Sequence, residues 1–596
     1  MSLRDELLAG ELHTHVRLAP GGGSVALVRT TASGPEIVAG DKVLATEHDH
    51  SVGGLMWTPD GTGLLYRRAP RGTERWELVL LRLAGGPPEV VSSGPVTDFW
   101  AAGEDILYAG RGALFRCRPG AAPPEEVAAD RTFHRWLVDR DLRVRGGIRL
   151  LRDGGLQLVL DGEVRLAIGV DEAAMFAVVG FSGDGTTLYV LSGHDAPTRR
   201  LLALGAATET LYAHPKLDVE GYPIGGPGVW FDPRTGLPDL CQTVAQRPEL
   251  HSLTPARDEA VRRLNADAEA VLLVDRAADD RTWLIVRVTS DGPIHYELID
   301  PETGAGRPVL VNRPGLLGRR LPRLTDLHFP ARDGTPISGY ALRPLDRAGP
   351  LPTVVVVHGG PAGRDYYRFH AEAQFLAALG YQSLHVNYRG SRGFGSAFRL
   401  AGNGEWGGLM QQDLYDAVAA GVERGLVDPA RVAFLGSSYG GFSALLAACT
   451  RPDLVRCAVA ISPPTDLAAL VTDTPGYWRP LAPALRRQIL GGRAPDGDWL
   501  RERSPVHTVR TDSAPMLVAH GVRDPRVPVA AVDEFVRVAR AAGPGVTYLR
   551  FDGEGHHVAS AAARRVLFSE IEHFLEAHLV HDDRPAPAPA ATPVHA

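Results

Sequence analysis

Residues 430–444 read ARVAFLGSSYGGFSA, and the fold of the C-terminal half can be built outward from this stretch. A short apolar run, 432–435, stops at a turn of glycines and serines, and a helix-like stretch begins at Phe442. Strand, tight turn and helix are the context in which G-x-S-x-G presents a nucleophile, here Ser438, above the end of a sheet. The alternative is an ordinary serine–glycine turn that leads into a core helix.

Two further groups follow the serine in the order that an α/β-hydrolase requires. A serine hydroxyl needs a base to take its proton, and the base needs a carboxylate to orient it. Asp524 follows the predicted buried strand 516–519, and a histidine, His556 or His557, follows the predicted strand 547–551. Each residue alone could be a solvated turn aspartate or a loop histidine. Together, in this order and at strand ends, they predict a catalytic triad.

An oxyanion hole needs backbone N–H groups aimed at the developing negative charge. One donor should be Tyr439, the residue after the nucleophile. The other should come from the glycine-rich turn 358–361, which follows the apolar run 353–357. We expect Gly360 to supply it, because close backbone approach to a substrate leaves no room for a side chain.

Helical stretches and buried strands alternate over 321–580, which predicts a doubly wound, mainly parallel sheet, the α/β-hydrolase catalytic domain. The expected elements are helices at 371–379 and 412–424 and strands at 382–386, 432–435, 457–461, 516–519 and 547–551. Residues 581–596 form a Pro/Ala-rich tail that we expect to be disordered.

The N-terminal half is β-like, and a weak repeat of a turn followed by an apolar strand runs through 15–320. Seven copies, one of them degenerate, are spaced at the length of a propeller blade: 19–22, 59–61, 103–105, 139–141, 183–185, 232–234 and 279–281. We therefore predict an N-terminal all-β domain that is a seven-bladed β-propeller, with a β-sandwich or two small β-domains as alternatives. Residues 1–14 form an N-terminal extension and could be a short helix that packs on the catalytic domain.

Composition excludes several classes of protein. Hydrophobic residues make up 44% of the chain and charged residues 22%, as in ordinary globular proteins. A net charge of −7 gives no reason to expect a nucleic-acid partner, and no apolar window is long enough to predict a membrane span. The four cysteines form no C-x-x-C pair, which excludes the usual zinc and redox spacings. We expect a cytoplasmic protein without a cofactor or metal, and the sequence leaves open whether it forms a homo-oligomer.

One short polar stretch could bind a metal by its composition. Residues 47–50 read EHDH, which offers carboxylate and imidazole ligands. In a turn between two blades such a stretch is more often a polar loop, and we expect the loop.

The motifs of the C-terminal half resemble those of the prolyl oligopeptidase family of serine peptidases. The matching stretches are HGGP at 358, NYRGSRGFG at 387, GEWGG at 404, GSSYGG at 436, RPDL at 451, HGVRDPRVP at 520 and GEGHH at 553. The resemblance covers about 321–580, and the family's N-terminal propeller agrees with the one predicted above. It implies that Ser438 is the nucleophile, Asp524 the acid and His556 the base, since His556 follows E-G in the family pattern.

Within the family the pattern is most similar to the acylaminoacyl peptidase and dipeptidyl peptidase branches. The resemblance implies that Arg526, two residues after the acid, contacts a substrate carbonyl, with a salt bridge to the propeller as the alternative. It also implies a specificity pocket drawn from the segment after the strand 457–461, which offers Pro464, Leu467, Leu470, Tyr477 and Trp478. Dipeptidyl peptidases hold the substrate's amino terminus with two propeller glutamates. We find no comparable pair here, because Glu125-Glu126 lies in a Pro/Ala-rich turn.

The leading hypothesis is therefore a serine peptidase that cleaves short peptides or aminoacyl and acylaminoacyl amides, with substrate size limited by the propeller. An esterase or amidase acting on a small peptide-like molecule is a second hypothesis, because the same triad cleaves both bonds. A catalytically inactive propeller scaffold that binds a partner is the third, and the intact triad argues against it.

Overall fold

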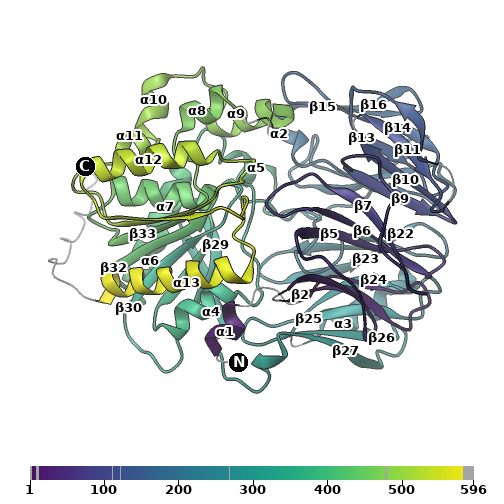
Figure 1. Cartoon of the computed structure of the whole chain (residues 1–596), viewed down its shortest axis with the longest axis horizontal. Helices are drawn as coiled ribbons and strands as arrows, with labels where there is room; N and C mark the ends of the chain where they lie inside the picture. Colours follow the sequence, from purple (N-terminus) through teal and green to yellow (C-terminus); the bar gives the residue numbers. More distant parts are fainter. Residues whose placement is uncertain are drawn as a thin grey trace.

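The computed structural model describes residues 3–8, 13–31, 33–110, 112–120, 123–267, 269–474, 476 and 479–580. Two domains lie side by side, a ring of small sheets and an α/β domain (Figure 1). The tail expected to be disordered, 581–596, lies outside the described residues.

Seven antiparallel sheets make up the ring, which confirms the predicted seven-bladed propeller. Among the residues described, the sheet that is sixth in chain order has three strands, and each of the other propeller sheets has four. The first four blades contain β1 (His13–Leu18), β2 (Val25–Thr31), β3 (Gly34–Ala39), β4 (Lys42–Thr46); β5 (His50–Trp57), β6 (Gly63–Pro70), β7 (Glu77–Arg82), β8 (Glu89–Val90); β9 (Asp98–Ala102), β10 (Asp105–Gly110), β11 (Ala113–Cys117), β12 (Glu125–Ala129); β13 (Phe133–Val138), β14 (Val144–Leu150), β15 (Leu156–Leu160) and β16 (Glu163–Ile168).

The last three blades contain β17 (Ala177–Phe181), β18 (Leu188–Ser192), β19 (Arg200–Leu204), β20 (Thr208–Tyr212); β21 (Val229–Phe231), β22 (Pro238–Val244), β23 (Pro248–Ser252); β24 (Ala270–Arg276), β25 (Trp283–Val288), β26 (Ile294–Ile299) and β27 (Gly306–Asn312). Two short helices, α2 (Val170–Ala173) and α3 (Asp258–Asn265), lie between blades.

The turn repeat seen in the sequence occupies one position in every blade, the connection between its first and second strands. An aspartate side chain often closes the turn by accepting a backbone N–H two residues on. Asp60 accepts from Thr62 at 3.0 Å, and Asp184 accepts from Thr186 at 3.1 Å. The repeat is therefore a turn signature, which explains why it survives where the strand sequences diverge.

The first and last blades meet without exchanging a strand, since β1–β4 and β24–β27 each form a complete sheet. The backbone N–H of Leu18 donates to Asp275 at 3.0 Å, and that of Ala278 donates to the carbonyl of Pro20 at 2.9 Å. Apolar side chains of both blades share one core. Side-chain packing and a few hydrogen bonds thus hold this seam.

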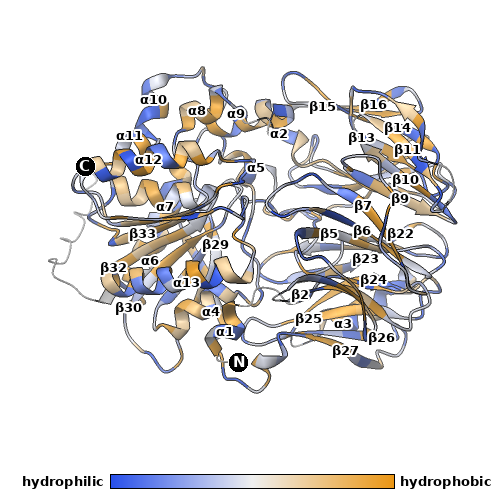
Figure 2. Cartoon of the chain, viewed as in Figure 1, coloured by the Kyte–Doolittle hydropathy of each residue, from blue (hydrophilic) through white to orange (hydrophobic). Residues whose placement is uncertain are grey.

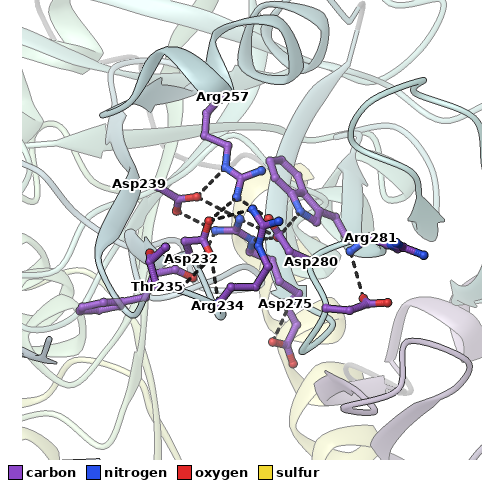
Figure 3. Close-up of polar contacts among 12 residues, drawn as sticks. Asp232, Arg234, Thr235, Asp239, Arg257, Asp275, Asp280 and Arg281 are labelled. Carbon is purple, nitrogen blue, oxygen red and sulfur yellow. Dashed lines mark hydrogen bonds and ion pairs between the residues drawn. The ribbon is translucent and has the colours of Figure 1, made fainter. Parts of the chain in front are cut away.

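A set of buried charges joins the sixth and seventh blades, and we call Asp232, Asp239, Arg257, Arg276 and Asp280 the paired charge cluster (Figure 3). Arg276 donates to both oxygens of Asp239, at 2.6 and 3.0 Å, and to Asp280 at 2.7 Å. Arg257 donates to Asp239 at 2.6 Å, to Asp232 at 3.0 Å and also to Asp280. These bidentate pairs replace the water that each ion loses on burial.

The C-terminal domain contains one eight-stranded sheet in the order β28-β29-β31-β30-β32-β33-β34-β35. Its strands are β28 (Leu324–Pro330), β29 (Pro336–Leu342), β30 (Leu351–Val357), β31 (Gln382–Asn387), β32 (Val427–Ser437), β33 (Cys457–Ile461), β34 (Met516–Gly521) and β35 (Val546–Phe551). The pairings of β29 with β28 and with β31 are antiparallel, and the other pairings are parallel. This confirms the mainly parallel α/β-hydrolase sheet. The helices are α4 (Ala371–Ala378), α5 (Ser396–Leu400), α6 (Leu409–Glu423), α7 (Tyr439–Thr450), α8 (Leu467–Thr472), α9 (Ala482–Leu490), α10 (Gly497–Glu502), α11 (Pro505–Thr508), α12 (Val529–Ala542) and α13 (Ala561–Leu575).

Alternate residues of the central strands fill two separate cores, so the strands read as continuous apolar runs (Figure 2). In β30, for example, Val355 and Val357 face the core shared with α6, α7 and α12. Val354 and Val356 face the core shared with α4 and α13. Strand β32 begins at Val427, five residues before the predicted start, because Val427 pairs with Leu351 of β30 ahead of a register shift.

Helix α1 (Leu3–Leu8) packs on the α/β domain although it precedes the whole propeller. Leu7 and Leu8 are buried in the same core as Phe568 and Leu575 of α13. The chain therefore enters through the α/β domain, builds the propeller, and returns at β28. Searching the described segments for a helix that is both long and apolar enough to span a bilayer finds none.

Candidate active site

Ser438 stands at the sharp turn between β32 and α7, at the carboxyl edge of the sheet. Its backbone has φ 58° and ψ −121°, a conformation that residues with a side chain rarely adopt. A Cβ on Gly440 would lie 2.0 Å from the carbonyl oxygen of Val357, and a Cβ on Gly436 would lie 2.4 Å from the backbone of Gly440. The turn therefore requires both glycines, and Ser438 itself remains partly exposed.

Asp524 and His556 lie in the loops after β34 and β35, which are adjacent parallel strands. Asp524 Oδ2 accepts a hydrogen bond of 2.7 Å from His556 Nδ1. The two loops are also joined through the main chain, because the N–H of Arg523 donates to the carbonyl of Glu554 at 2.9 Å. The structure thus brings together the acid and the base that the sequence predicted.

The hydrogen bonds of Asp524 decide which ring nitrogen of His556 carries a proton. Asp524 Oδ1 accepts the backbone N–H groups of Arg526 and Val527, at 2.8 and 3.1 Å. Burial alone would raise the pKa of Asp524, but the hydrogen bond from His556 and these amides outweigh it and hold the pKa below its ordinary value. An ionised carboxylate only accepts, so His556 Nδ1 carries the proton and Nε2 keeps its lone pair. This is the tautomer that a general base needs.

Glu554, which sequence reasoning missed, holds the loop that carries His556. It is buried, and its carboxylate accepts the N–H groups of Ala559 at 2.8 Å and Ser560 at 3.3 Å. Ser560 in turn caps α13 by accepting the N–H of Ala563 at 3.3 Å. A glutamate two residues before the histidine and a serine at a helix start were the signals available in the sequence.

The glycine turn 358–361 lies beside the nucleophile, since a Cβ on Gly359 would be 3.6 Å from the Cβ of Ser438. Gly360 has φ 128°, a region open in practice only to glycine. Tyr439 is the first residue of α7, so its N–H belongs to the helix turn that has no intrahelical acceptor. The expected oxyanion donors, Gly360 and Tyr439, thus belong to two segments that meet at Ser438.

Three side chains that sequence reasoning did not single out hold this turn. His358 Nε2 lies 2.9 Å from Ser391 Oγ, and the Tyr388 hydroxyl donates to the carbonyl of His358 at 2.9 Å. The rings of His358 and Tyr388 stack at 4.3 Å. Burial lowers the pKa of His358 to about 4, so it stays neutral and acts as a support.

The propeller touches both catalytic loops through the connection between β6 and β7. Arg526 donates from Nε and Nη2 to one oxygen of Glu74, at 3.0 and 2.8 Å. A Cβ on Gly555 would lie 2.8 Å from the carbonyl oxygen of Gly72, so the backbones are in contact there. The predicted substrate-binding residue Arg526 therefore makes the interdomain salt bridge that was its alternative role, and its contact with a substrate stays a prediction.

A second interdomain pair is fully buried. Arg364 donates to Glu220 at 2.9 Å and to the carbonyls of Val244 and Ala245 at 3.0 and 2.8 Å. Sequence reasoning missed it because the two charged residues lie 144 positions apart. Glu220 is a buried propeller carboxylate already engaged by an arginine.

The predicted specificity pocket is resolved in part. Leu467 is fully buried in the core of the α/β domain, so its side chain offers no surface to a substrate. Pro464 is also buried, whereas Leu470 is partly exposed. Tyr477 and Trp478 lie outside the described residues.

The EHDH stretch connects β4 of the first blade to β5 of the second, and its side chains contact both blades. Glu47 accepts from the Tyr66 hydroxyl at 2.5 Å and from Arg68 at 3.1 Å. His48 Nδ1 lies 3.0 Å from the carbonyl of Ser33. The carboxylate is therefore paired with an arginine and a tyrosine of the same sheet.

Comparison with known proteins finds a peptidase family and relatives that are named as peptidases or acylamino-acid-releasing enzymes. Residues 367–582 match the profile of the prolyl oligopeptidase family. The chain is 29% identical to dipeptidyl aminopeptidase BIII of Pseudoxanthomonas mexicana over 87% of its own length and 79% of that protein. It is 31% identical to acylamino-acid-releasing enzyme 2 of Oryza sativa subsp. japonica over 35% of its length and 28% of that protein. A puromycin-hydrolyzing peptidase of Mycobacterium tuberculosis has the same fold, with a TM-score of 0.78 at 20% identity, covering 98% of this chain and 97% of that one.

Proposed function

We propose that Ser438, Asp524 and His556 form the catalytic triad of this chain, a serine peptidase whose catalytic domain belongs to the prolyl oligopeptidase family. The observation that carries the proposal is the 2.7 Å hydrogen bond from His556 to Asp524 on the sheet edge that also presents the strained Ser438. Strain at a non-glycine residue persists only where the surrounding structure enforces it, and it gathers at functional sites.

In this proposal Ser438 Oγ attacks the substrate carbonyl while His556 Nε2 accepts its proton. The N–H groups of Tyr439 and Gly360 donate to the oxyanion that forms. His556 then protonates the leaving amine, and the acyl group stays on the serine. Water, deprotonated by the same histidine, releases the acid and restores the enzyme. Asp524 stays ionised throughout and stabilises the imidazolium.

We infer that the substrates are short peptides. The connection between β6 and β7 lies against the loops that carry Asp524 and His556, so an entering chain must pass between the two domains. Two relatives are named for releasing dipeptides and acylamino acids, which supports action near the end of a peptide. A cytoplasmic location belongs to the proposal, and it is supported by four cysteines that are all buried and form no disulfide among the described residues.

A panel of chromogenic substrates tests this proposal. Aminoacyl and dipeptidyl anilides with free and with acetylated amino termini, a peptide of about five residues and unfolded casein should be compared by kcat/KM. We expect cleavage of the small substrates and resistance of casein. Efficient degradation of casein by the intact protein would contradict the size limit. Puromycin and matched aminoacyl esters in the same panel test the second candidate, an amidase or esterase of small peptide-like molecules, which predicts turnover of these and none of the peptides.

A further inference from the structure

Three potential metal ligands meet on the side of the fold that the catalytic mechanism does not use. Asp365 and His370 lie in the segment between the glycine turn and α4, and His385 lies on β31. One ligand atom from each residue lies within 4.8 Å of the others. The rings of His370 and His385 are 5.0 Å apart. Three donors at such separations can reach a single cation with small side-chain shifts.

A hydrogen bond to a carbonyl fixes the tautomer of His370, and a hydroxyl contact engages one ring nitrogen of His385. His370 Nε2 lies 2.8 Å from the carbonyl of Tyr366, and a carbonyl only accepts, so Nε2 carries the proton and Nδ1 keeps a lone pair. His385 Nε2 lies 3.1 Å from the Ser383 hydroxyl, which leaves Nδ1 as its second nitrogen. Metal-binding histidines in proteins are oriented in this way, by a hydrogen bond from the nitrogen that does not ligate.

Two of the three ligands are buried with unused atoms. Within the part of the chain that the structure describes, Asp365 Oδ2 and His385 Nδ1 have no hydrogen-bond partner, although the side chains are 91% or more buried. Asn387 fixes the backbone of Asp365 through two hydrogen bonds, of 2.7 and 3.2 Å, so the carboxylate cannot turn away freely. A buried polar atom without a partner costs about 1–3 kcal/mol, and such a cost calls for an explanation.

We propose that Asp365, His370 and His385 bind a divalent transition-metal ion, with Zn²⁺ as the preferred ion. Two imidazole nitrogens and one carboxylate suit zinc, whereas Mg²⁺ and Ca²⁺ favour sets of oxygen ligands. A cavity of about 220 Å³ opens beside His370 and provides a route for the ion and room for a water as fourth ligand. Arg313, Arg368 and Arg564 line this cavity together with Glu372, so the ion would pass three positive charges and one negative charge on this route.

The proposed ion ties two segments that the catalytic domain depends on. It joins β31 to the segment that begins at the glycine turn and contains Arg364, the partner of Glu220 across the domain interface. The role is therefore structural, and none of the three ligands belongs to the proposed triad. The metal proposal and the peptidase proposal can consequently fail separately.

A second cluster in the propeller provides the matched control. Glu172, His194 and Asp195 are also close enough to hold an ion. His194 is already paired there through both ring nitrogens, with Glu172 at 2.6 Å and Asp195 at 3.3 Å. Both ring nitrogens of His194 already face a carboxylate, so we expect these three side chains to pair with one another instead of binding an ion.

The test is zinc binding to the full-length protein after EDTA treatment and dialysis. Titration with ZnCl₂ by calorimetry should show one tight site per chain, and saturating zinc should raise Tm by several degrees. CoCl₂ in place of zinc should give visible absorption bands typical of mixed nitrogen and oxygen ligands. His194→Gln should behave as the wild type. Asp365→Asn and His385→Gln should each weaken zinc binding at least tenfold and abolish the rise in Tm.

The cobalt spectrum of the wild type keeps the proposal testable if a variant does not fold, and circular dichroism identifies such a variant. No zinc binding at micromolar concentration and no cobalt bands would overturn the proposal. So would zinc binding that His194→Gln abolishes while Asp365→Asn and His385→Gln retain it.

Discussion

The paired charge cluster of the propeller and the Asp524–His556 pair of the catalytic domain are both buried. They differ in whether their hydrogen bonds leave a basic atom available for chemistry. In the propeller, Arg257 and Arg276 donate to three aspartates, and Arg276 also donates to the carbonyl of Phe231 in the neighbouring blade. At the sheet edge, the hydrogen bond between Asp524 and His556 uses one ring nitrogen and orients the other.

This difference distinguishes buried charges that stabilise the structure from buried charges that prepare a group for catalysis. A closed set of ion pairs joins two blades, and removing one member leaves an uncompensated charge inside the protein. An open set leaves one basic atom ready to take a proton. Variants in the two places should therefore affect stability and turnover in opposite patterns, and the predictions below are ordered by the size of the expected effect.

Ser438→Ala should lower kcat/KM for a short peptide by at least ~10³-fold, because the nucleophile is lost and only binding and the oxyanion hole remain. Thermal unfolding should be unchanged, since Ser438 contributes little to the core. Ser443→Ala, in the helix α7 that follows, removes a hydroxyl bonded to Gln411 and should retain turnover. A Ser438→Ala variant with a tenth of wild-type activity would identify another nucleophile.

Asp239→Asn should show the reverse pattern. It removes a charge that both Arg257 and Arg276 contact, so it should destabilise the propeller by about 3–5 kcal/mol, the usual cost of breaking a buried ion pair. Denaturant unfolding measures this loss, while kcat on the remaining folded protein should stay near the wild-type value.

Asp141→Asn is the control, because Asp141 lies in the β13–β14 turn of another blade and pairs with Arg143 on the surface. Exposed pairs contribute roughly 0–1 kcal/mol. If both variants unfold at the same denaturant concentration, burial of the cluster does not matter to stability.

Acidification should reduce kcat/KM about tenfold per pH unit, because only the neutral form of His556 accepts the serine proton. Burial lowers the pKa of His520 and of His557, so we expect neither to add a second proton to the slope. The pKa of Asp524 is also lowered, so its own protonation belongs to still lower pH. A slope of two would implicate another histidine, and His557→Gln should leave the profile unchanged.

Arg526→Ala should give the smallest effect, a severalfold rise in KM for peptides and a smaller one for a minimal ester that lacks the contacted carbonyl. Glu74→Gln separates the two roles of Arg526, because it breaks the interdomain pair and keeps the guanidinium. We expect Glu74→Gln to leave KM for peptides close to that of the wild type. An equal change in both variants, on both substrates, would assign Arg526 to the interface alone.

The fold could be predicted because its signals, turn residues and strand ends, are local in the sequence. All seven turns that the repeat marked connect the first and second strands of a blade, since turn chemistry is a property of a few adjacent residues. The strand ends that placed Asp524 and His556 could be read in the same way, because parallel strands present their following loops at one edge.

Contacts between distant segments could not be predicted. Glu74 and Arg526 are 452 positions apart, and nothing in either neighbourhood points to the other. Leu467 was assigned to a pocket by its position after a strand, but its side chain faces the core. A shift of one residue along a helix changes which face a side chain lies on, and the sequence does not fix that shift. Asp365, His370 and His385 match no ligand spacing, because it is the pairing of β31 with its neighbours that brings them together.

The packing of helix α1 has a consequence for the order of events during synthesis. Leu7 and Leu8 are synthesised long before Phe568 and Leu575, with which they share a core. The propeller, complete by Asn312, can fold while the rest is still being made. The catalytic domain, in contrast, closes its core only when the two ends of the chain meet. A nascent chain that lacks α13 therefore lacks a finished core in the catalytic domain, and we expect peptidase activity only after α13 has been synthesised.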